Sequence, residues 1–323
     1  MSAPPPALSL LSRPLALIGR QGTRAVAASV FVGLALPGLA ALAKPFLLAC
    51  IFALLSLSFL RTDATGMRAR HRTSVLVAAL IWIMGILPAA FGVLVSRLYP
   101  PQDNGLMLAL VMQAAAPPIM STPAFAALLG IDATVSLSVM VLSMLVTPLT
   151  APVVVGAFTD GALALDGMAL AVRLAVVLVG TGVVGFGLRW WLGPPRIARM
   201  RDTLDGVNVI LLLILALGLM DGVTARFMAD PWLVLGMAGL TFLISAGAML
   251  STLVLFRWAG RGQNLMLGFA AGHRNISLMI AATGALLPDS TWLYIAVAQF
   301  PIYLLPFLLR PLARRLAPPA PGP

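Results

Sequence analysis

Two short polar stretches interrupt segments of the chain that are otherwise apolar enough to cross a membrane. The first, Ala116–Pro123, contains Pro117, Pro118 and Pro123, and the second, Gly272–Ser277, reads Gly-His-Arg-Asn-Ile-Ser. Proline lacks a backbone N–H and glycine is a weak helix former, so neither stretch is expected to continue a regular helix. Broken backbone at membrane depth is tolerated only where protein buries it or where it lines a water-filled cavity. Paired breaks in the two halves of a chain are typical of binding sites in secondary transporters.

The second stretch holds two side chains that could do chemistry, His273 and Arg274. An arginine at mid-membrane costs about 2.5–3.5 kcal/mol on insertion scales and indicates a functional site. Its planar guanidinium suits bidentate capture of a carboxylate, sulfonate or phosphate. Alternatively, Arg274 donates to backbone carbonyls freed by the two breaks. His273 is either a proton-coupling group or a hydrogen-bonded spacer.

Short polar side chains flank both breaks and are placed to cap the half-helices that follow. Two half-helix N-termini directed at one midplane cavity would give it a positive potential without any charged side chain. The candidate substrate-binding residues are therefore Arg274, His273, Asn275, Ser121, Thr122 and Ser277. The candidate helix-break residues are Pro117, Pro118, Pro123 and Gly272, and we expect no catalytic residue and no metal site.

The composition requires membrane-spanning helices to position these residues. The chain has 323 residues, is 60% hydrophobic and 10% charged, and has a mean hydropathy of +1.02. With about 20 apolar residues per span, the sequence predicts an all-α polytopic membrane protein with ten helices. The predicted spans are 24–40, 42–60, 72–97, 104–130, 133–158, 167–190, 205–224, 231–256, 262–287 and 291–310.

The distribution of basic residues predicts the orientation of the chain. Of the Lys and Arg residues outside the spans or at their edges, sixteen fall on the side of the N-terminus and four on the opposite side, with Arg274 inside a span. The positive-inside rule then places both termini in the cytoplasm. We expect a multi-pass protein of the cell membrane, of the bacterial inner-membrane kind. The net charge of +11 lies in loops between spans, which argues against nucleic-acid binding.

A weak internal repeat divides the chain into two halves of five helices. Ala127-Leu128-Leu129 before Asp132 resembles Ala285-Leu286-Leu287 before Asp289, and each aspartate is predicted to N-cap the next helix. An odd number of helices per half makes the halves inverted, with discontinuous fourth and ninth helices crossing at the midplane. We therefore expect one membrane transport domain over 1–323, with repeats at 24–158 and 167–312. Ordinary helix-start chemistry is the alternative explanation of the motif.

From Ala116 to Val153 the chain resembles the bile acid:sodium symporter family. The resemblance rests on the proline-containing break, on Leu129-Gly130-Ile131-Asp132, on the serine-rich helix that follows, and on Val146–Pro152. Gly272-His273-Arg274-Asn275 stands where the family has its second crossover motif. The resemblance implies a panel made of helices 1, 2, 6 and 7, which moves relative to a core made of the other six.

The chain departs from the family at most positions that would bind sodium. Thr122 and Ser136 remain as possible cation-binding remnants, but Met140 and Ala270 replace a family Thr and Glu, and a family Gln is replaced near Ile83. The chain has no Glu at all, and no Asp lies near these positions. Sodium would therefore lack most of its oxygen ligands.

Arg274 replaces a further family Gln and adds a positive charge close to where sodium would sit. Like charges ~4 Å apart repel by about 4 kcal/mol at an effective dielectric of 20. The inference is that Arg274 replaces the bound sodium electrostatically and that sodium coupling is altered or absent.

We therefore expect a secondary active transporter that carries a small or amphipathic organic anion by alternating access. The alternatives are a sodium-coupled symporter, as in the family at large, and an arsenite-type efflux permease. An integral-membrane enzyme is disfavoured because the chain has two His, no Glu and no spacing that suggests a catalytic dyad. The expected partners are a small anionic substrate and the lipid bilayer, with no cofactor. Substrate identity, transport direction and oligomeric state stay open.

Overall fold

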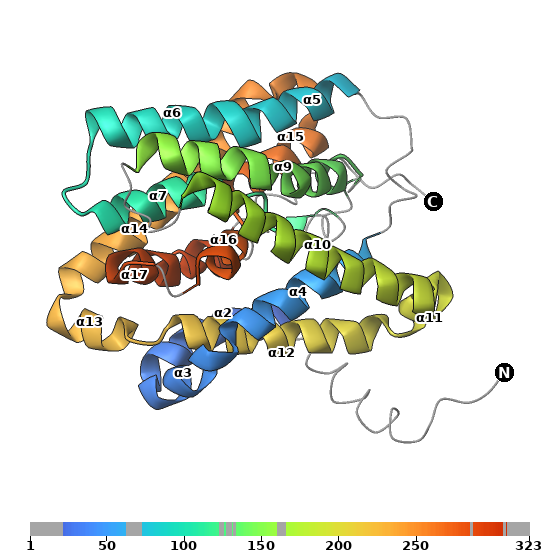
Figure 1. The fold of residues 1–323 in the computed structure, drawn as a ribbon, viewed down its shortest axis with the longest axis horizontal. Coiled ribbons are helices and arrows are strands. Elements are labelled where there is room, and N and C mark those ends of the chain that lie inside the picture. The colour runs from blue at the N-terminus through green and yellow to red at the C-terminus, as the bar shows by residue number, and fades with distance from the viewer. Residues whose placement is uncertain are drawn as a thin grey trace. The chain divides into compact units, whose positions relative to one another are not determined.

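The computed structural model describes residues 22–62, 73–122, 126, 131, 134–159, 166–284, 287–305 and 308. Every regular element in these ranges is a helix (Figure 1). Six helices of the described chain are long and apolar enough to span a membrane, which agrees with the expected all-helical, multi-pass protein. They are Pro37–Arg61, Thr73–Leu98, Thr134–Phe158, Gly167–Leu192, Arg201–Ala229 and Pro231–Leu255.

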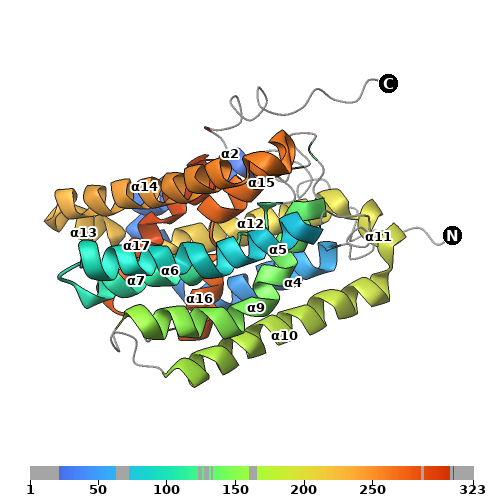
Figure 2. The same ribbon diagram turned by 90° about the horizontal axis from the view of Figure 1, so that it is seen from above.

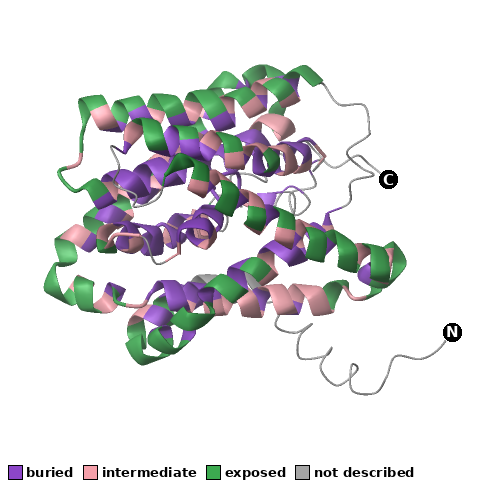
Figure 3. Cartoon of the chain, in the orientation of Figure 1, coloured by how far each residue is buried: buried purple, intermediate pink, exposed green. Residues whose placement is uncertain are grey.

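The outer faces of these helices are apolar, as a lipid environment requires. Along α10 (Gly167–Leu192), exposed apolar side chains recur every three or four residues: Met168, Val172, Val176, Val179 and Val183. Figure 3 shows the exposed faces of the helices in green. Contiguous apolar surface of this extent is unusual for a protein in water. The bilayer is therefore the environment that fits this chain.

The chain forms two compact units. The first contains Met1–Thr62 with Val179–Pro231, and the second contains Asp63–Leu178 with Trp232–Pro323. Helix α10 contributes to both units, because their boundary falls at Val179.

The first unit is built around α12 (Arg201–Leu219), which packs against three helices from the start of the chain. Two ion pairs, Lys44–Asp221 and Arg61–Asp205, each close at 2.9 Å. The elements of this unit besides α12 and the second part of α10 are α2 (Gly22–Ala35), α3 (Pro37–Ala43), η1 (Lys44–Phe46), α4 (Leu47–Arg61), α11 (Pro194–Arg199) and α13 (Val223–Ala229).

The first two predicted spans, 24–40 and 42–60, have their boundary in the wrong place. Helix α2 ends at Ala35, Leu36 is non-helical, and the second span begins at Pro37. The residue before a proline is driven out of the α region, and proline is well suited to the first helical position. Pro37 therefore ends one helix and starts the next.

The second unit contains the helices that carry the polar interruptions. Its third-span helix is continuous in Figure 2 and includes two π-helical turns, η3 and η4. The elements are α5 (Thr73–Ile81), η3 (Trp82–Ile86), α6 (Leu87–Val93), η4 (Leu94–Leu98), α7 (Asn104–Ala115), α9 (Thr134–Phe158), the first part of α10, α14 (Pro231–Leu255), η5 (Arg257–Ala259), α15 (Arg261–Gly272), α16 (Ile276–Thr283) and α17 (Asp289–Val297).

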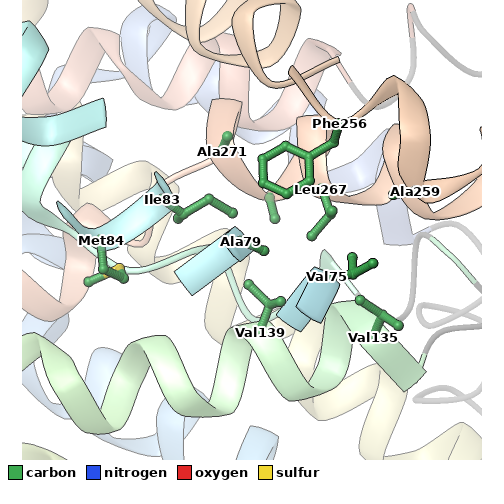
Figure 4. Packing of buried hydrophobic residues seen from close by; sticks show 11 residues of the cluster. Val75, Ala79, Ile83, Met84, Val135, Val139, Phe256, Ala259, Leu267 and Ala271 are labelled. Atoms are coloured by element: carbon green, nitrogen blue, oxygen red, sulfur yellow. The ribbon is translucent and has the colours of Figure 1, made fainter. Parts of the chain in front are cut away.

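An apolar cluster holds the third span, α9 and α15 together (Figure 4). Val75, Ala79 and Ile83 from the third span meet Val135 and Val139 from α9, and Leu267, Ala270 and Ala271 from α15 also belong to the cluster. All eight residues are buried, most of them completely. This packing fixes the end of α15 beside the π-helical turn η3.

Only one of the two aspartates that were predicted to N-cap a helix lies in the described residues. Asp132 lies outside the described residues. Asp289 is the first residue of α17 rather than its N-cap, a position that Pro288 occupies without a side-chain hydrogen bond, so this prediction was wrong. Pro288 fits there because its backbone is extended and because its missing N–H is not needed at a helix start. The side chain of Asp103, in contrast, accepts a hydrogen bond from the Gly105 N–H and caps α7.

Polar contacts attach α17 to α7. The Tyr294 hydroxyl donates to Oε1 of Gln113 at 2.6 Å, and the Thr291 hydroxyl donates to the Gly105 carbonyl, also at 2.6 Å. All of these groups are buried.

Replacing Tyr294 by Phe removes the donor and leaves the buried Gln113 oxygen without it, a loss of about 1–3 kcal/mol. We expect a lower thermal unfolding midpoint for Tyr294→Phe in detergent. Tyr99→Phe is the control, because Tyr99 is 75% exposed, and its midpoint should match the wild type. Equal midpoints for both variants would contradict the packing role of this hydrogen bond.

Candidate functional site

The two polar interruptions are unwound and pair with each other. Helix α7 ends at Ala115 and α15 at Gly272, and the residues that follow, Ala116 and His273, have extended backbones. The Ile119 N–H donates to the His273 carbonyl at 2.8 Å, and the Asn275 N–H donates to the Pro117 carbonyl at 2.7 Å. These two bonds form an isolated antiparallel bridge between Pro118 and Arg274. We call the paired segments, 116–119 and 273–275, the crossover.

The prolines suit this pairing as well as they suit the helix break. In an antiparallel bridge of this type, the two bonds come from the residues on either side of the bridged pair. Pro117 contributes a carbonyl and Ile119 an N–H, and neither hydrogen bond of the bridge requires an N–H from Pro118. The two prolines therefore end α7 without removing any N–H that the crossover uses. Pro123 lies outside the described residues.

The Arg274 guanidinium binds three backbone carbonyls at the crossover. Its Nε donates to Ala271 at 2.9 Å, its Nη1 to Ala116 at 3.0 Å and its Nη2 to Ile83 at 3.0 Å. The residue is 4% exposed. One side chain thus connects the end of α7, the end of α15 and the third span.

The carbonyls of Ala116 and Ala271 are free because their helices stop. In a continuous helix the carbonyl of Ala271 would accept from the N–H of Asn275, but that N–H is bonded to Pro117. The carbonyl of Ala116 lies one residue beyond the end of α7. Such orphan carbonyls at a buried helix end require other donors, and Arg274 supplies them.

The Ile83 carbonyl is free for a different reason, inside a helix that does not break. In the π-helical turn, the Leu87 N–H bonds five residues back to Trp82 rather than four residues back to Ile83. The next donor in that register would be residue 88, but Pro88 has no N–H. The π turn and Pro88 together leave the Ile83 carbonyl without a backbone donor, and it accepts a hydrogen bond from Nη2 of Arg274.

Arg274 takes part in neither of the ion pairs described above, Lys44–Asp221 and Arg61–Asp205. The guanidinium charge is therefore surrounded by carbonyl dipoles, and no carboxylate of the described residues neutralises it. Three of its five N–H groups bind these carbonyls. Of the two roles considered for Arg274, donation to freed carbonyls is the one seen in this geometry. Contact with an anion stays a prediction.

His273 lies on the other side of the crossover. Adjacent side chains of an extended segment point to opposite faces, so His273 lies on the face opposite Arg274. The His273 ring stacks on Phe269, with centroids 3.9 Å apart, and its Nδ1 lies 3.0 Å from the Phe269 carbonyl. The residue is 1% exposed, and its Nε2 has no hydrogen-bond partner.

The smaller polar candidates are placed less uniformly. Thr122 is buried and its hydroxyl donates back to the Ile119 carbonyl at 2.7 Å, whereas Ser121 is exposed. Asn275 is the N-cap residue of α16 but makes no side-chain capping bond, and Ser277 is half-buried in the first turn. Ser136 is buried within α9. The crossover thus brings together Arg274, His273, Asn275, Pro117 and Pro118, with Thr122 nearby through Ile119.

Gly272 has a packing role at the end of α15. A Cβ atom there would lie 2.6 Å from the Ser245 carbonyl of α14 and 3.1 Å from the Cβ of Met249. Backbone atoms cannot move aside easily, so only glycine permits this approach. Gly272 therefore lets α15 end directly against α14.

Reasoning from the sequence missed the contribution of Pro88 and the ring contact of Phe269. It singled out Ile83 only as the place of a replaced family Gln. A proline inside a long apolar span was the available signal, because it removes a donor from a carbonyl four or five residues earlier. Nothing in the sequence indicated which side chain would take up that carbonyl.

Comparison of the chain with protein-family models and with curated proteins finds no match to either. The likeness to the bile acid:sodium symporters thus rests on the short motifs quoted above.

The role of Pro88 can be tested with a double-mutant cycle. Pro88→Ala restores an N–H that can compete for the Ile83 carbonyl, and Arg274→Lys removes the guanidinium donors. Because both changes act on one carbonyl, we expect a coupling energy of at least about 0.5 kcal/mol in thermal or denaturant unfolding.

Pro148, inside α9, is the matched control for this cycle. It lies nine residues beyond Val139, about 13 Å further along the helix than the cluster near Ile83. Pro148→Ala and Arg274→Lys should be additive. Additivity of the Pro88 pair as well would show that Pro88 does not influence Arg274.

Proposed function

We propose that the protein is a secondary active transporter that carries a small or amphipathic organic anion by alternating access. The observation that carries the proposal is the crossover itself. Two interrupted helices pair through their extended segments around a buried guanidinium that has no carboxylate partner among the described residues. Discontinuous helices that meet in this way are typical of substrate and ion sites in secondary transporters.

The charge at the crossover favours an anion over a cation. A unit charge ~8 Å from the guanidinium interacts with it by about 2 kcal/mol at an effective dielectric of 20. That energy attracts an anion and repels sodium by the same amount. Since Arg274 is held by the chain and cannot dissociate, we propose that transport does not depend on sodium.

Alternating access requires two bodies that move relative to each other, and the division of the chain into two units supports it. We propose that the first unit is the panel and the second the core. The assignment differs from the resemblance at one point, because Gly167–Leu178 of the sixth predicted span groups with the second unit.

The packing of the second unit supports the proposed inverted repeats. In a five-helix repeat, α7 would correspond to α15 and α17 to α9. Helix α7 packs against both α9 and α17, and α15 packs against α9, so each interrupted helix contacts the last helix of the other half. We propose the ten-helix inverted arrangement on this basis, with both termini cytoplasmic from the distribution of basic residues.

The proposal is tested by anion uptake into proteoliposomes, with and without a sodium gradient. Wild-type uptake should be the same in both conditions. Arg274→Gln removes the charge and should reduce uptake at least about tenfold, since ~1.4 kcal/mol of lost attraction corresponds to tenfold. Arg274→Lys, which keeps the charge, should retain more uptake than Arg274→Gln.

Arg189→Gln is the matched control, because Nη1 of Arg189 also donates to a backbone carbonyl, that of Leu60 at 3.1 Å. Its uptake should remain near wild type. If Arg274→Gln is monodisperse and transports normally, Arg274 has no part in the mechanism. Uptake that requires sodium would instead favour a sodium-coupled symporter.

A further inference from the structure

We propose that Nε2 of His273 is a binding site for one hydrogen-bond donor, an O–H or N–H group carried by the transported anion. This inference rests on the proposed function and narrows its substrate class to anions that bear a hydroxyl or amine group. It concerns a different face of the crossover from the one that Arg274 occupies.

The hydrogen bond of Nδ1 fixes the character of Nε2. The Phe269 carbonyl, 3.0 Å from Nδ1, can only accept, so Nδ1 carries the ring proton in this contact. In a neutral imidazole the other nitrogen is then a bare acceptor. Nε2 therefore presents a lone pair.

That lone pair is buried, and no group of the described chain donates a hydrogen bond to it. His273 is 1% exposed, and Nε2 has no hydrogen-bond partner in the described structure. Buried polar groups without a partner are few in folded proteins, and each calls for an explanation. A donor on a bound ligand would supply the missing hydrogen bond.

The described contacts of the ring, with Phe269 and Pro301, supply no donor to Nε2. The Phe269 ring covers one face, and the Pro301 carbonyl, from the helical stretch 299–305, interacts with the ring but is itself an acceptor. The adjacent residue Arg274 is a strong donor, but its three nitrogens are bonded to carbonyls on the opposite face.

Titratable groups in the surrounding elements do not offer a permanent partner either. Helices α7, α14 and α16 contain no Asp, Lys, Arg, His or Tyr. Helix α15 begins with Arg261 at its far end, and α17 holds Asp289 at its start and Tyr294, whose hydroxyl donates to Gln113. Tyr303 follows in the stretch 299–305. A free proton that binds Nε2 would satisfy the same lone pair. The experiment distinguishes such a proton from a donor group on the transported anion.

The experiment compares sulfonates that differ by a single hydroxyl, because sulfonates stay ionised and do not cross lipid by themselves. The pairs are isethionate with ethanesulfonate and 4-hydroxybenzenesulfonate with benzenesulfonate. For each pair, the concentration that gives half-maximal uptake is measured in vesicles loaded with a pH-sensitive dye. In the wild type we expect the hydroxylated member to be taken up at a concentration about tenfold lower, the equivalent of about 1.4 kcal/mol.

Two substitutions separate the role of Nδ1 from the role of Nε2. His273→Asn can replace the Nδ1 donor but places no acceptor at Nε2, and should reduce the ratio within each pair to about one. His273→Gln reaches the Nε2 position with an amide oxygen and should keep the preference. The ratio within one variant does not depend on how much protein folds. His273→Phe, which keeps a ring on Phe269, provides a second test of the loss.

Each result decides the question. Uptake by the wild type without a hydroxyl preference, or a preference that His273→Asn retains, overturns this inference alone. Acidification of the lumen during ethanesulfonate uptake that is lost in His273→Asn, without any hydroxyl preference, would assign Nε2 to a free proton and also overturn it. If the wild type takes up neither member of any pair, this inference fails, while the proposed function is decided by its own uptake assay with other organic anions.

Discussion

The structure of the second unit depends on one buried cation and the three carbonyls that it binds. Two carbonyls are free because α7 and α15 stop, and the third because a π turn and Pro88 withdraw its donor. Three unsatisfied carbonyls at membrane depth would each cost free energy, and so would a bare guanidinium. Together they satisfy one another. The two helix breaks, the π turn and the arginine therefore form a single interaction and not four separate irregularities.

This interaction also gives the crossover two chemically different faces. Arg274 points toward the third span, so under the proposed function its charge would act on a ligand at a distance rather than through a free fork of donors. His273 lies on the opposite face, where its Nε2 has no hydrogen-bond partner among the described residues. A bound alkali ion could leave between transport cycles, but a side chain cannot. We therefore regard the fixed charge as the main physical reason to expect a carrier of anions that is independent of sodium.

Much of the fold could be predicted from the sequence, because apolar length and proline chemistry are local properties. The long helices and the interruptions after Ala115 and Gly272 follow from them, and so does the alternative role of Arg274 as a donor to freed carbonyls. The pairing of Pro118 with Arg274 could not be predicted, because it joins residues far apart in the chain. The Ile83 carbonyl was unpredictable for the same reason, since its partner depends on how the third span packs against α15. At Pro37 and Asp289 the expected helix boundaries were wrong because a neighbouring proline set the start of the helix.

The most direct test of this account is an experimental structure of the protein in lipid nanodiscs at a resolution that places the Arg274 side chain. The account predicts non-helical backbone at 116–119 and 273–275, paired through Pro118 and Arg274, with the guanidinium within hydrogen-bonding distance of the carbonyls of Ala116, Ala271 and Ile83. A continuous helix through Pro118 or through Arg274, or a guanidinium that faces lipid or bulk water, would contradict it.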